Sequence, residues 1–135
     1  MPVRVFTLEE ANRLLPEVEE AIRWLQQTVS QIVQAQDRIS VLDVLGAAER
    51  SSPEHEDLLA TRRTLEELLG GYNEKLNEVQ RIGCVLKDIN HGVVDFYGLK
   101  DGRLIFLCWR MGEKAIDYWH EVTTGMMGRR PVSEL

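Results

Sequence analysis

The stretch Gly83–Trp109, GCVLKDINHGVVDFYGLKDGRLIFLCW, is where the chain changes from helical to strand-like patterning. Residues 90–92 (Asn-His-Gly) and 101–102 (Asp-Gly) are turn signals, because these residue types tolerate the positive φ angles of tight turns. They separate three apolar runs, CVLKDI, VVDFY and RLIFLCW. The stretch therefore predicts a three-stranded antiparallel meander.

The third of these runs is apolar on both of its faces. Alternate residues of a strand point to opposite sides. Here one side carries Leu104, Phe106 and Cys108, and the other carries Ile105, Leu107 and Trp109. Such a strand needs cover on both faces. We expect helices on one face and the C-terminal segment, or a partner subunit, on the other.

The residues before Gly83 predict a long helical hairpin. Thr7 and Glu10 have the spacing of a capping box, in which each side chain satisfies a free backbone N–H of the first turn. Pro16 is expected to break or kink the helix near Leu14–Leu15, because proline removes a hydrogen bond and clashes with the preceding turn. A short kinked helix should therefore precede the long one.

Apolar residues then repeat in steps of four and three along two stretches, as in a coiled-coil seam. The first seam is Val18, Ile22, Leu25, Val29, Ile32, Gln36 and Ile39, and the second is Leu58, Arg62, Leu65, Leu69, Tyr72, Leu76 and Val79. Gly46 should end the first helix, and the second is expected over residues 54–81, continuous across Gly70–Gly71. The short connector predicts an antiparallel pair. Because a lone hairpin buries only one stripe per helix, we expect the sheet or a second copy of the chain to cover the rest.

The C-terminal segment is expected to form a short helix over EKAIDYWH, after Gly112, and then a loop through residues 125–128. The predicted fold class is α+β. Residues 1–82 should form the helical hairpin, and residues 83–135 the sheet and terminal segment. A chain of 135 residues is long enough for one core, so a single domain spanning 1–135 is expected.

Composition and charge exclude several classes of partner. The net charge is −6, and all of this excess acidity lies before Gly83. A nucleic-acid partner is not expected, because such proteins carry a basic stripe. No apolar run approaches the roughly 18–20 residues of a membrane span, and the N-terminus lacks the apolar core of a signal peptide. These features predict a cytoplasmic protein without a membrane partner. No cofactor motif is present, so no cofactor is expected.

The richest set of chemically capable side chains lies near the C-terminus. Glu113, Trp119, His120 and Arg129 are a candidate ligand-binding or catalytic group. Histidine can act as a base or a metal ligand, and arginine can hold a carboxylate or phosphate with two hydrogen bonds. The alternative is structural: His120 would cap the C-terminal end of the short helix, and Arg129 would pair with Asp95 or Glu113.

A second candidate group surrounds the first turn of the meander. Asp88 and Asp95 could converge across the hairpin, with His91 at its tip, and so hold a divalent metal. The alternative is that these side chains satisfy local backbone groups of the turn. A mixed zinc site from Cys84, Cys108 and the histidines is also conceivable, but the spacings match no short ligand motif, which favours reduced core thiols.

Several motifs in the second half resemble one prokaryotic family. They are Gly83, Lys87-Asp88, Gly92-Val93-Val94-Asp95-Phe96, Gly102-Arg103, Cys108-Trp109, Gly112-Glu113, Trp119-His120, Gly125, Gly128-Arg129 and Pro131. With the N-terminal FTLEEANRLLP, they resemble the family catalogued as domain of unknown function 2203 over nearly the whole chain. The resemblance implies a prokaryotic, cytosolic protein and leaves its activity open.

Two functions follow as hypotheses. The long seams and the absence of a catalytic motif favour a homodimeric interaction or assembly module that presents an acidic helical surface. The alternative is a small-molecule- or metal-binding protein, or an enzyme, with a site around Glu113, His120 and Arg129. The sequence identifies no substrate, no reaction and no protein partner other than a second copy of the chain.

Overall fold

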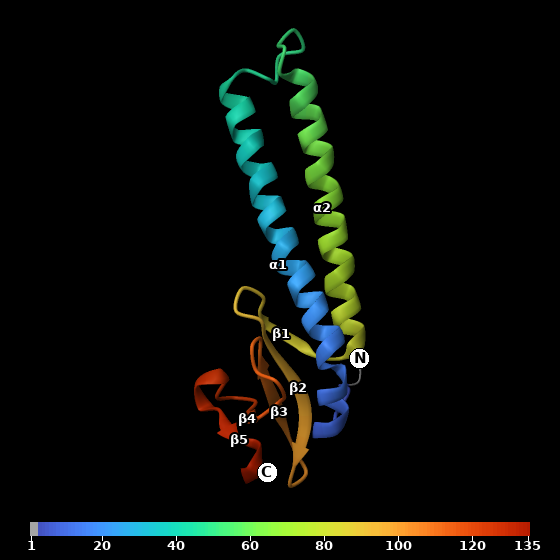
Figure 1. Cartoon of the computed structure of the whole chain (residues 1–135), viewed down its shortest axis with the longest axis vertical. Coiled ribbons are helices and arrows are strands. Elements are labelled where there is room, and N and C mark those ends of the chain that lie inside the picture. The colour runs from blue at the N-terminus through green and yellow to red at the C-terminus, as the bar shows by residue number, and fades with distance from the viewer. Residues whose placement is uncertain (1–2) are drawn as a thin grey trace. The chain divides into compact units, whose positions relative to one another are not determined.

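The computed structural model describes residues 3–135, and the chain consists of two long helices followed by a five-stranded antiparallel sheet (Figure 1). The predicted α+β class is therefore confirmed. The helices are α1 (Leu8–Val44) and α2 (His55–Ile82), the strands are β1 (Val85–Asp88), β2 (Val93–Lys100), β3 (Arg103–Arg110), β4 (Tyr118–Glu121) and β5 (Arg130–Pro131), and the 3-10 turns are η1 (Met126–Gly128) and η2 (Val132–Glu134). Neither helix has the length and apolar character needed to cross a membrane within the described residues.

The chain divides into two compact units. One unit combines the N-terminal residues through Arg23 with Asn77–Leu135, and so contains the sheet and one end of each helix. The other unit is Trp24–Leu76, which contains the rest of the two helices and their connector.

The first turn of α1 forms as the sequence predicts. The backbone N–H of Thr7 donates to Glu10 Oε1 at 2.9 Å, and the N–H of Glu10 donates to Thr7 Oγ1 at 3.1 Å. These reciprocal bonds lower the pKa of Glu10, chiefly because the Thr7 backbone N–H stabilises the carboxylate. The residues on either side, Phe6 and Ala11, are buried. The capping box is thus confirmed.

The predicted break at Pro16 is wrong, because α1 runs through this residue without interruption. The kink, which was the other expectation, stays a prediction. Pro16 itself is exposed, whereas Leu15 and Val18 on either side of it are buried in the core. Burial of such side chains is worth more than the one backbone hydrogen bond that proline removes. Packing of this stretch in the core therefore maintains the helix that local propensity disfavours.

Within Trp24–Leu76 the helices run antiparallel, and their buried seam differs in detail from the predicted one. Ion pairing joins Arg38 to Asp57 near the connector, and the Lys75 ammonium lies over the Trp24 ring at the other end. Gln36 and Arg62 are exposed, and the small neighbours Ala35 and Thr61 are buried in their place. The buried seam therefore shifts by one residue at Gln36 and at Arg62, and these two polar side chains stay on the surface.

Both ends of the connector agree with prediction. Gly46 adopts a φ of 78°, which suits the left-handed residue that ends a helix. Ser52 Oγ accepts the backbone N–H of Glu54 at 3.2 Å just before α2 begins. Helix α2 continues across Gly70–Gly71, and a Cβ on Gly71 would lie 3.3 Å from the Trp24 ring. One of the two glycines therefore makes room for an aromatic ring of the same unit.

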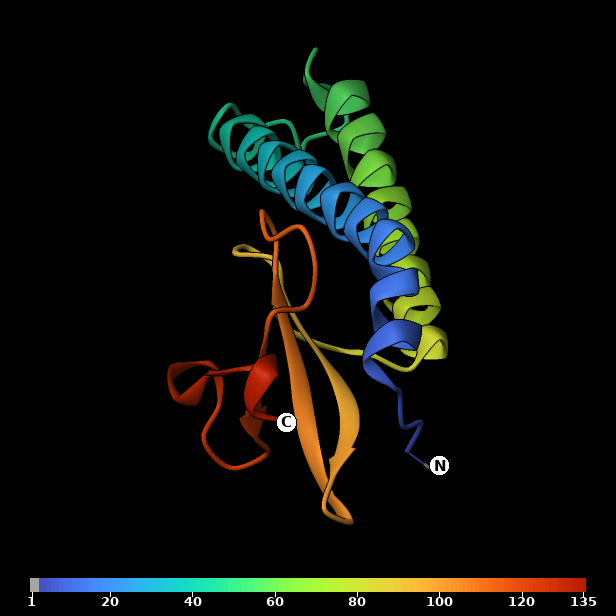
Figure 2. The ribbon, with the colours of Figure 1, turned by 60° about the horizontal axis from the view of Figure 1, so that its bottom comes forward.

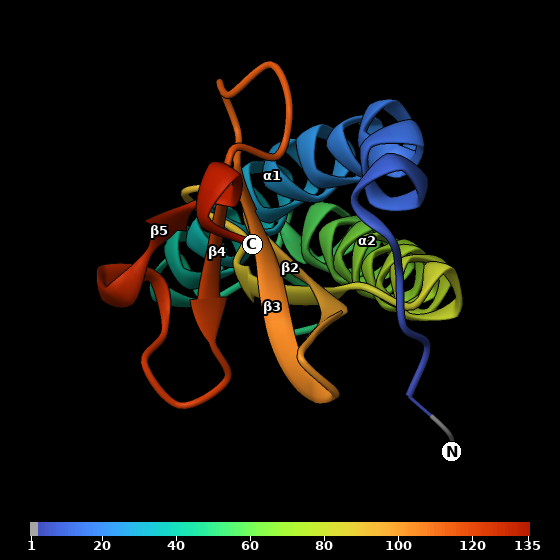
Figure 3. The same cartoon turned by 90° about the horizontal axis from the view of Figure 1, so that it is seen from below.

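The sheet is larger than the predicted three-stranded meander. Its order is β1-β2-β3-β4-β5, and every neighbouring pair is antiparallel. The β2–β3 hairpin turns at Asp101 and Gly102, whose φ angles of 52° and 78° are those of a two-residue primed turn. Figure 3 shows β4 and β5 extending the sheet beyond β3.

The short helix expected over EKAIDYWH is also wrong, because residues 118–121 form β4. Strand β3 would otherwise present an edge of unpaired backbone groups, and pairing with β4 satisfies them. The strand geometry also separates two neighbouring side chains: Trp119 joins the core face and His120 the opposite face. Cross-strand pairing therefore prevails over helical propensity in this stretch.

The two faces of the sheet have different surroundings. One face joins the N-terminal part of α1 in a single core, which includes Ala11, Leu15, Val18, Ile22, Val94, Phe96, Ile105, Leu107, Trp109 and Trp119. Figure 2 shows the start of α1 beside the β2–β3 hairpin. The opposite face carries Asp95, Phe106, Cys108 and His120, which are also buried. The expectation that β3 is covered on both faces is thus confirmed.

Candidate functional site

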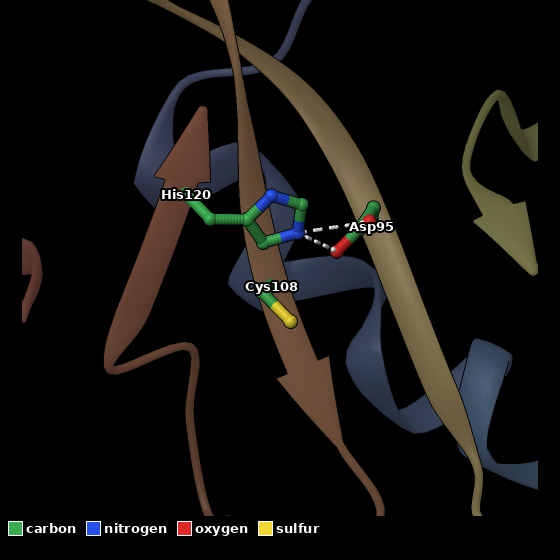
Figure 4. A group of neighbouring side chains, drawn as sticks. All are labelled: Asp95, Cys108 and His120. Carbon is green, nitrogen blue, oxygen red and sulfur yellow. Dashed lines mark hydrogen bonds and ion pairs between the residues drawn. The ribbon is translucent and has the colours of Figure 1, made fainter. Parts of the chain in front are cut away.

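Three neighbouring strands bring together an aspartate, a cysteine and a histidine (Figure 4). Asp95 of β2 lies directly opposite Cys108 of β3, so both side chains are on the same face. His120 of β4 is paired with Phe106, and its imidazole extends across β3 to Asp95. One potential ligand atom from each of the three residues lies within 4.8 Å of the other two. We call these residues the buried triad.

The buried triad is excluded from solvent. Asp95, Cys108 and His120 are 1%, 0% and 2% exposed. A carboxylate in such a position is costly unless positive charge and hydrogen bonds compensate for the lost water. The chemistry of the triad therefore depends on what supplies that positive charge.

The hydrogen bonds of His120 determine where its protons lie. Nδ1 is 2.7 Å from the backbone oxygen of Glu121, which can only accept, so Nδ1 carries a proton and donates it. Nε2 lies 3.1 Å from each carboxylate oxygen of Asp95. A neutral imidazole would thus direct its Nε2 lone pair at an anion. A proton shared between Nε2 and Asp95, or a metal cation between the ring and the carboxylate, removes this repulsion.

The thiol of Cys108 is protonated when no cation is near it. Burial raises its pKa to about 12, and the neighbouring Asp95 carboxylate contributes further. Cys84, in the core on the other side of the sheet, has its pKa raised to about 11, also chiefly by burial. These pKa values argue against a nucleophilic thiolate at either residue, because a reactive cysteine needs a lowered pKa and access to solvent.

We expect neither thiol to react with Ellman's reagent in the folded, metal-free protein at about pH 8, because both are buried and protonated. Both should react at once after unfolding in guanidinium. The measurement is the time course of absorbance with and without denaturant. A rapid reaction of one thiol in the native protein would show that its site opens readily.

Glu113 and Arg129 pair with each other beside the buried triad. Arg129 Nη2 donates to both carboxylate oxygens of Glu113, at 2.7 and 2.9 Å, and lies 3.4 Å from the backbone oxygen of Cys108. The guanidinium also stacks on Tyr118, 4.2 Å from the ring centre. Glu113 Oε1 in turn accepts the backbone N–H of Arg110 at 2.7 Å. We call the Glu113–Arg129 pair the clasp.

The predicted ligand group of Glu113, Trp119, His120 and Arg129 is therefore divided. Glu113 and Arg129 form the clasp, and His120 belongs to the buried triad. Trp119 lies in the core on the opposite face, with no hydrogen-bond partner for its Nε1 among the described residues. The alternative in which His120 caps a helix is wrong, because its segment is a strand. Arg129 pairs with Glu113, one of its two expected partners.

The predicted metal group of Asp88, His91 and Asp95 is divided as well. Asp88 and His91 form an exposed pair within the turn, with Oδ2 2.7 Å from Nδ1. This hydrogen bond from His91 is the main cause of the lowered pKa of Asp88. Asp95 belongs instead to the buried triad. The sequence suggests Cys108 as a zinc ligand only together with Cys84, because the helix expected over EKAIDYWH does not place His120 beside it.

The model of the family described as "Uncharacterized conserved protein (DUF2203)" matches residues 4–132. The chain belongs to the DUF2203 family. No curated protein and no solved structure matches the chain. For this DUF2203 protein, the chemistry of the buried triad and the surfaces of its two units are therefore the basis on which a function can be argued.

Proposed function

We propose that this DUF2203 protein binds a divalent transition-metal ion through Asp95, Cys108 and His120. The observation that carries the proposal is the orientation of His120, whose Nδ1 donates to a carbonyl while Nε2 faces a carboxylate. Metal-binding histidines commonly have this arrangement, in which one ring nitrogen is held by a carbonyl and the other binds the ion. The sequence contains no cofactor motif and predicts other metal groups, because the three proposed ligands come from three separate strands.

The alternative to a metal ion between His120 and Asp95 is a second proton on His120 Nε2. The resulting imidazolium would share one N–H between the two carboxylate oxygens of Asp95, each 3.1 Å away. In the protonated pair the Cys108 thiol only donates a hydrogen bond to Asp95. A metal ion engages all three groups, which is why we favour it.

Charge and ligand type both suit a metal of the zinc class. A carboxylate, a thiolate and a neutral imidazole carry two negative charges, which a divalent ion neutralises in a buried site. Ligands in a tetrahedral zinc site lie roughly 3.2–3.8 Å apart, given bonds of roughly 2.0–2.3 Å. The triad atoms, all within 4.8 Å, need only small side-chain movements to reach this spacing. Sulfur and nitrogen ligands disfavour Ca²⁺ and Mg²⁺.

The test is reconstitution with cobalt and zinc. The chain is unfolded with chelator and refolded with Co²⁺, and we expect one ion per chain together with the absorption of a cobalt–thiolate bond. Native mass spectrometry with Zn²⁺ should give the same stoichiometry. Refolded wild-type protein that binds neither ion would overturn the proposal.

Matched variants identify the ligands. Cys108→Ser should abolish the cobalt–thiolate absorption, whereas Cys84→Ser, at the other buried cysteine, should leave it unchanged. His91→Asn is the control for His120→Asn, because His91 also pairs with an aspartate but lies on the surface. If a ligand variant fails to fold, as circular dichroism would reveal, the wild-type cobalt spectrum still decides whether a thiolate binds the ion.

Homodimeric assembly is a second candidate function, supported by the small core of residues 24–76. The apolar side chains buried there are Leu25, Ala35, Leu42, Ala47 and Leu58, and the exposed ones include Trp24, Val33, Val41, Val44, Leu45 and Leu69. A helical hairpin with so little buried apolar area is marginal alone. A second copy can cover the same surface on both subunits about a two-fold axis.

We therefore expect the wild-type chain to sediment as a dimer. Nine acidic and five basic residues give residues 24–76 a net charge of −4, so added salt should strengthen association by screening repulsion. Val44 is 88% exposed, and Val44→Glu should yield a monomer. Val122→Glu, at an exposed valine of the other unit, is the control. A wild-type monomer at high micromolar concentration would contradict the assembly proposal.

A further inference from the structure

We infer that the Glu113–Arg129 clasp controls how fast the metal enters and leaves the buried triad. This inference rests on the proposed metal-binding function. Each triad residue is at most 2% exposed, so an ion cannot exchange without a local opening. The question is which contact has to break.

Arg129 lies across the face of the sheet that carries the triad. Tyr118 is opposite Cys108 in the β3–β4 register, so the two side chains share the face of Asp95. The Arg129 guanidinium stacks on Tyr118 and its Nη2 approaches the Cys108 backbone oxygen. Its positive charge is also close enough to lower the pKa of the Cys108 thiol, against the larger effect of burial. Arg129 is thus a direct neighbour of the proposed sulfur ligand.

Glu113 fixes Arg129 in this position. Its carboxylate binds Arg129 Nη2 through both oxygens and accepts the N–H of Arg110, while its backbone oxygen accepts Trp109 Nε1–H at 2.9 Å. The pair is partly protected from water, with side-chain exposures of 17% for Arg129 and 21% for Glu113. Glu113 is therefore held in place by hydrogen bonds to residues at the end of β3.

The segment that carries Arg129 is joined to the sheet by few backbone hydrogen bonds. Strand β5 is only two residues long and pairs with Tyr118 and Trp119. Beyond it, the N–H of Val132 donates to the backbone oxygen of Asp117 at 2.9 Å. Segments with few backbone hydrogen bonds open at low cost in free energy. Farther along, Arg130 lies over the Trp119 ring and Lys100 Nζ donates to the Glu134 backbone oxygen. The clasp is the ion pair of this segment that lies beside Cys108, so we expect its rupture to be the step that exposes the sulfur.

A residue that only gates access to the metal changes the rates of metal entry and release, whereas a ligand also changes the affinity. If Glu113 and Arg129 are not ligands, loss of the clasp speeds metal entry and release together and leaves affinity nearly unchanged. We expect Glu113→Gln to release Co²⁺ to excess chelator about tenfold faster than the wild type, because opening becomes more frequent. Its equilibrium affinity, measured by competition, should stay within about threefold of the wild type.

The control is Arg103→Gln, which breaks the exposed Arg103–Glu121 pair on the same sheet, where Nη2 is 2.6 Å from Oε1. This variant should release the metal at the wild-type rate. Arg129→Lys is the second variant: it keeps the charge but cannot reproduce the two-oxygen pairing and the ring stacking, so it should also release faster. It serves as the test if Glu113→Gln does not fold.

The outcomes separate the two proposals. A wild-type chain that binds no metal refutes the metal site itself. A chain that binds metal but releases it equally fast in wild type, Glu113→Gln and Arg129→Lys refutes the clasp alone. A fall in affinity as large as the gain in release rate also refutes the gate, because Glu113 would then contribute to holding the ion.

Discussion

Replacing Asp95 by asparagine is expected to lower the free energy of unfolding by about 3–5 kcal/mol in the presence of chelator, the usual cost of removing one partner of a buried charged pair. Asparagine keeps the size of the side chain but not its charge. Nε2 of His120 would then lose the carboxylate that it faces in a buried site. The measurement is urea unfolding followed by circular dichroism.

Asp88→Asn is the matched control, because Asp88 also pairs with a histidine but in an exposed turn. Exposed pairs contribute about 0–1 kcal/mol, so this variant should unfold close to the wild type. Saturating Zn²⁺ should stabilise the wild type and not Asp95→Asn, because only a bound ion shifts the unfolding equilibrium. Equal stability of both variants would show that the Asp95–His120 contact contributes little.

Replacing Gly92 by alanine is expected to cost about 3 kcal/mol. Gly92 has a φ of 68°, a conformation that costs other residues roughly 1–2 kcal/mol. The new Cβ would also lie 2.6 Å from Cβ of Met111, an atom next to the backbone that cannot move aside alone. Such overpacking typically adds about 1–3 kcal/mol. The Met111 N–H bonds to the Gly92 oxygen at 2.9 Å, so separating the two segments would weaken that bond as well.

Gly102→Ala separates the cost of the positive φ from the cost of the contact with Met111. Gly102 has a similar φ of 78°, but a Cβ there would meet nothing within 4 Å. Its cost should therefore be the backbone penalty of roughly 1–2 kcal/mol alone. The comparison is made by thermal unfolding of both variants. Equal losses would mean that Met111 yields to the added methyl group without cost.

Much of the fold follows from local signals in the sequence. The capping box at Thr7, the glycine at position 46 and the Asp-Gly turn at 101–102 each require a particular backbone geometry, and each occurs as predicted. The errors have a different origin. At Pro16 and in β4, contacts with distant segments outweigh local propensity, and a single sequence does not reveal those contacts.

Part of the candidate site could likewise be predicted from the sequence, and part of it could not. Counting outward from the two-residue turn at 101–102 places Asp95 directly opposite Cys108, so this half of the buried triad could have been predicted. His120 could not, because its segment has to be recognised as a strand before its partner is known. Likewise, the proximity of Glu113 and Arg129 depends on how the C-terminal segment returns to the sheet.

The division of the chain into two units has a consequence for its synthesis. One unit is continuous from Trp24 to Leu76, whereas the other joins the N-terminal residues through Arg23 to Asn77–Leu135. On the ribosome, the contacts within the continuous unit can therefore form while the sheet is still unsynthesised. The first turns of α1, with Ala11 and Leu15, have to wait for Trp109 and Trp119 before their apolar surface is covered. During that interval the apolar face of this N-terminal segment is exposed to solvent on the nascent chain.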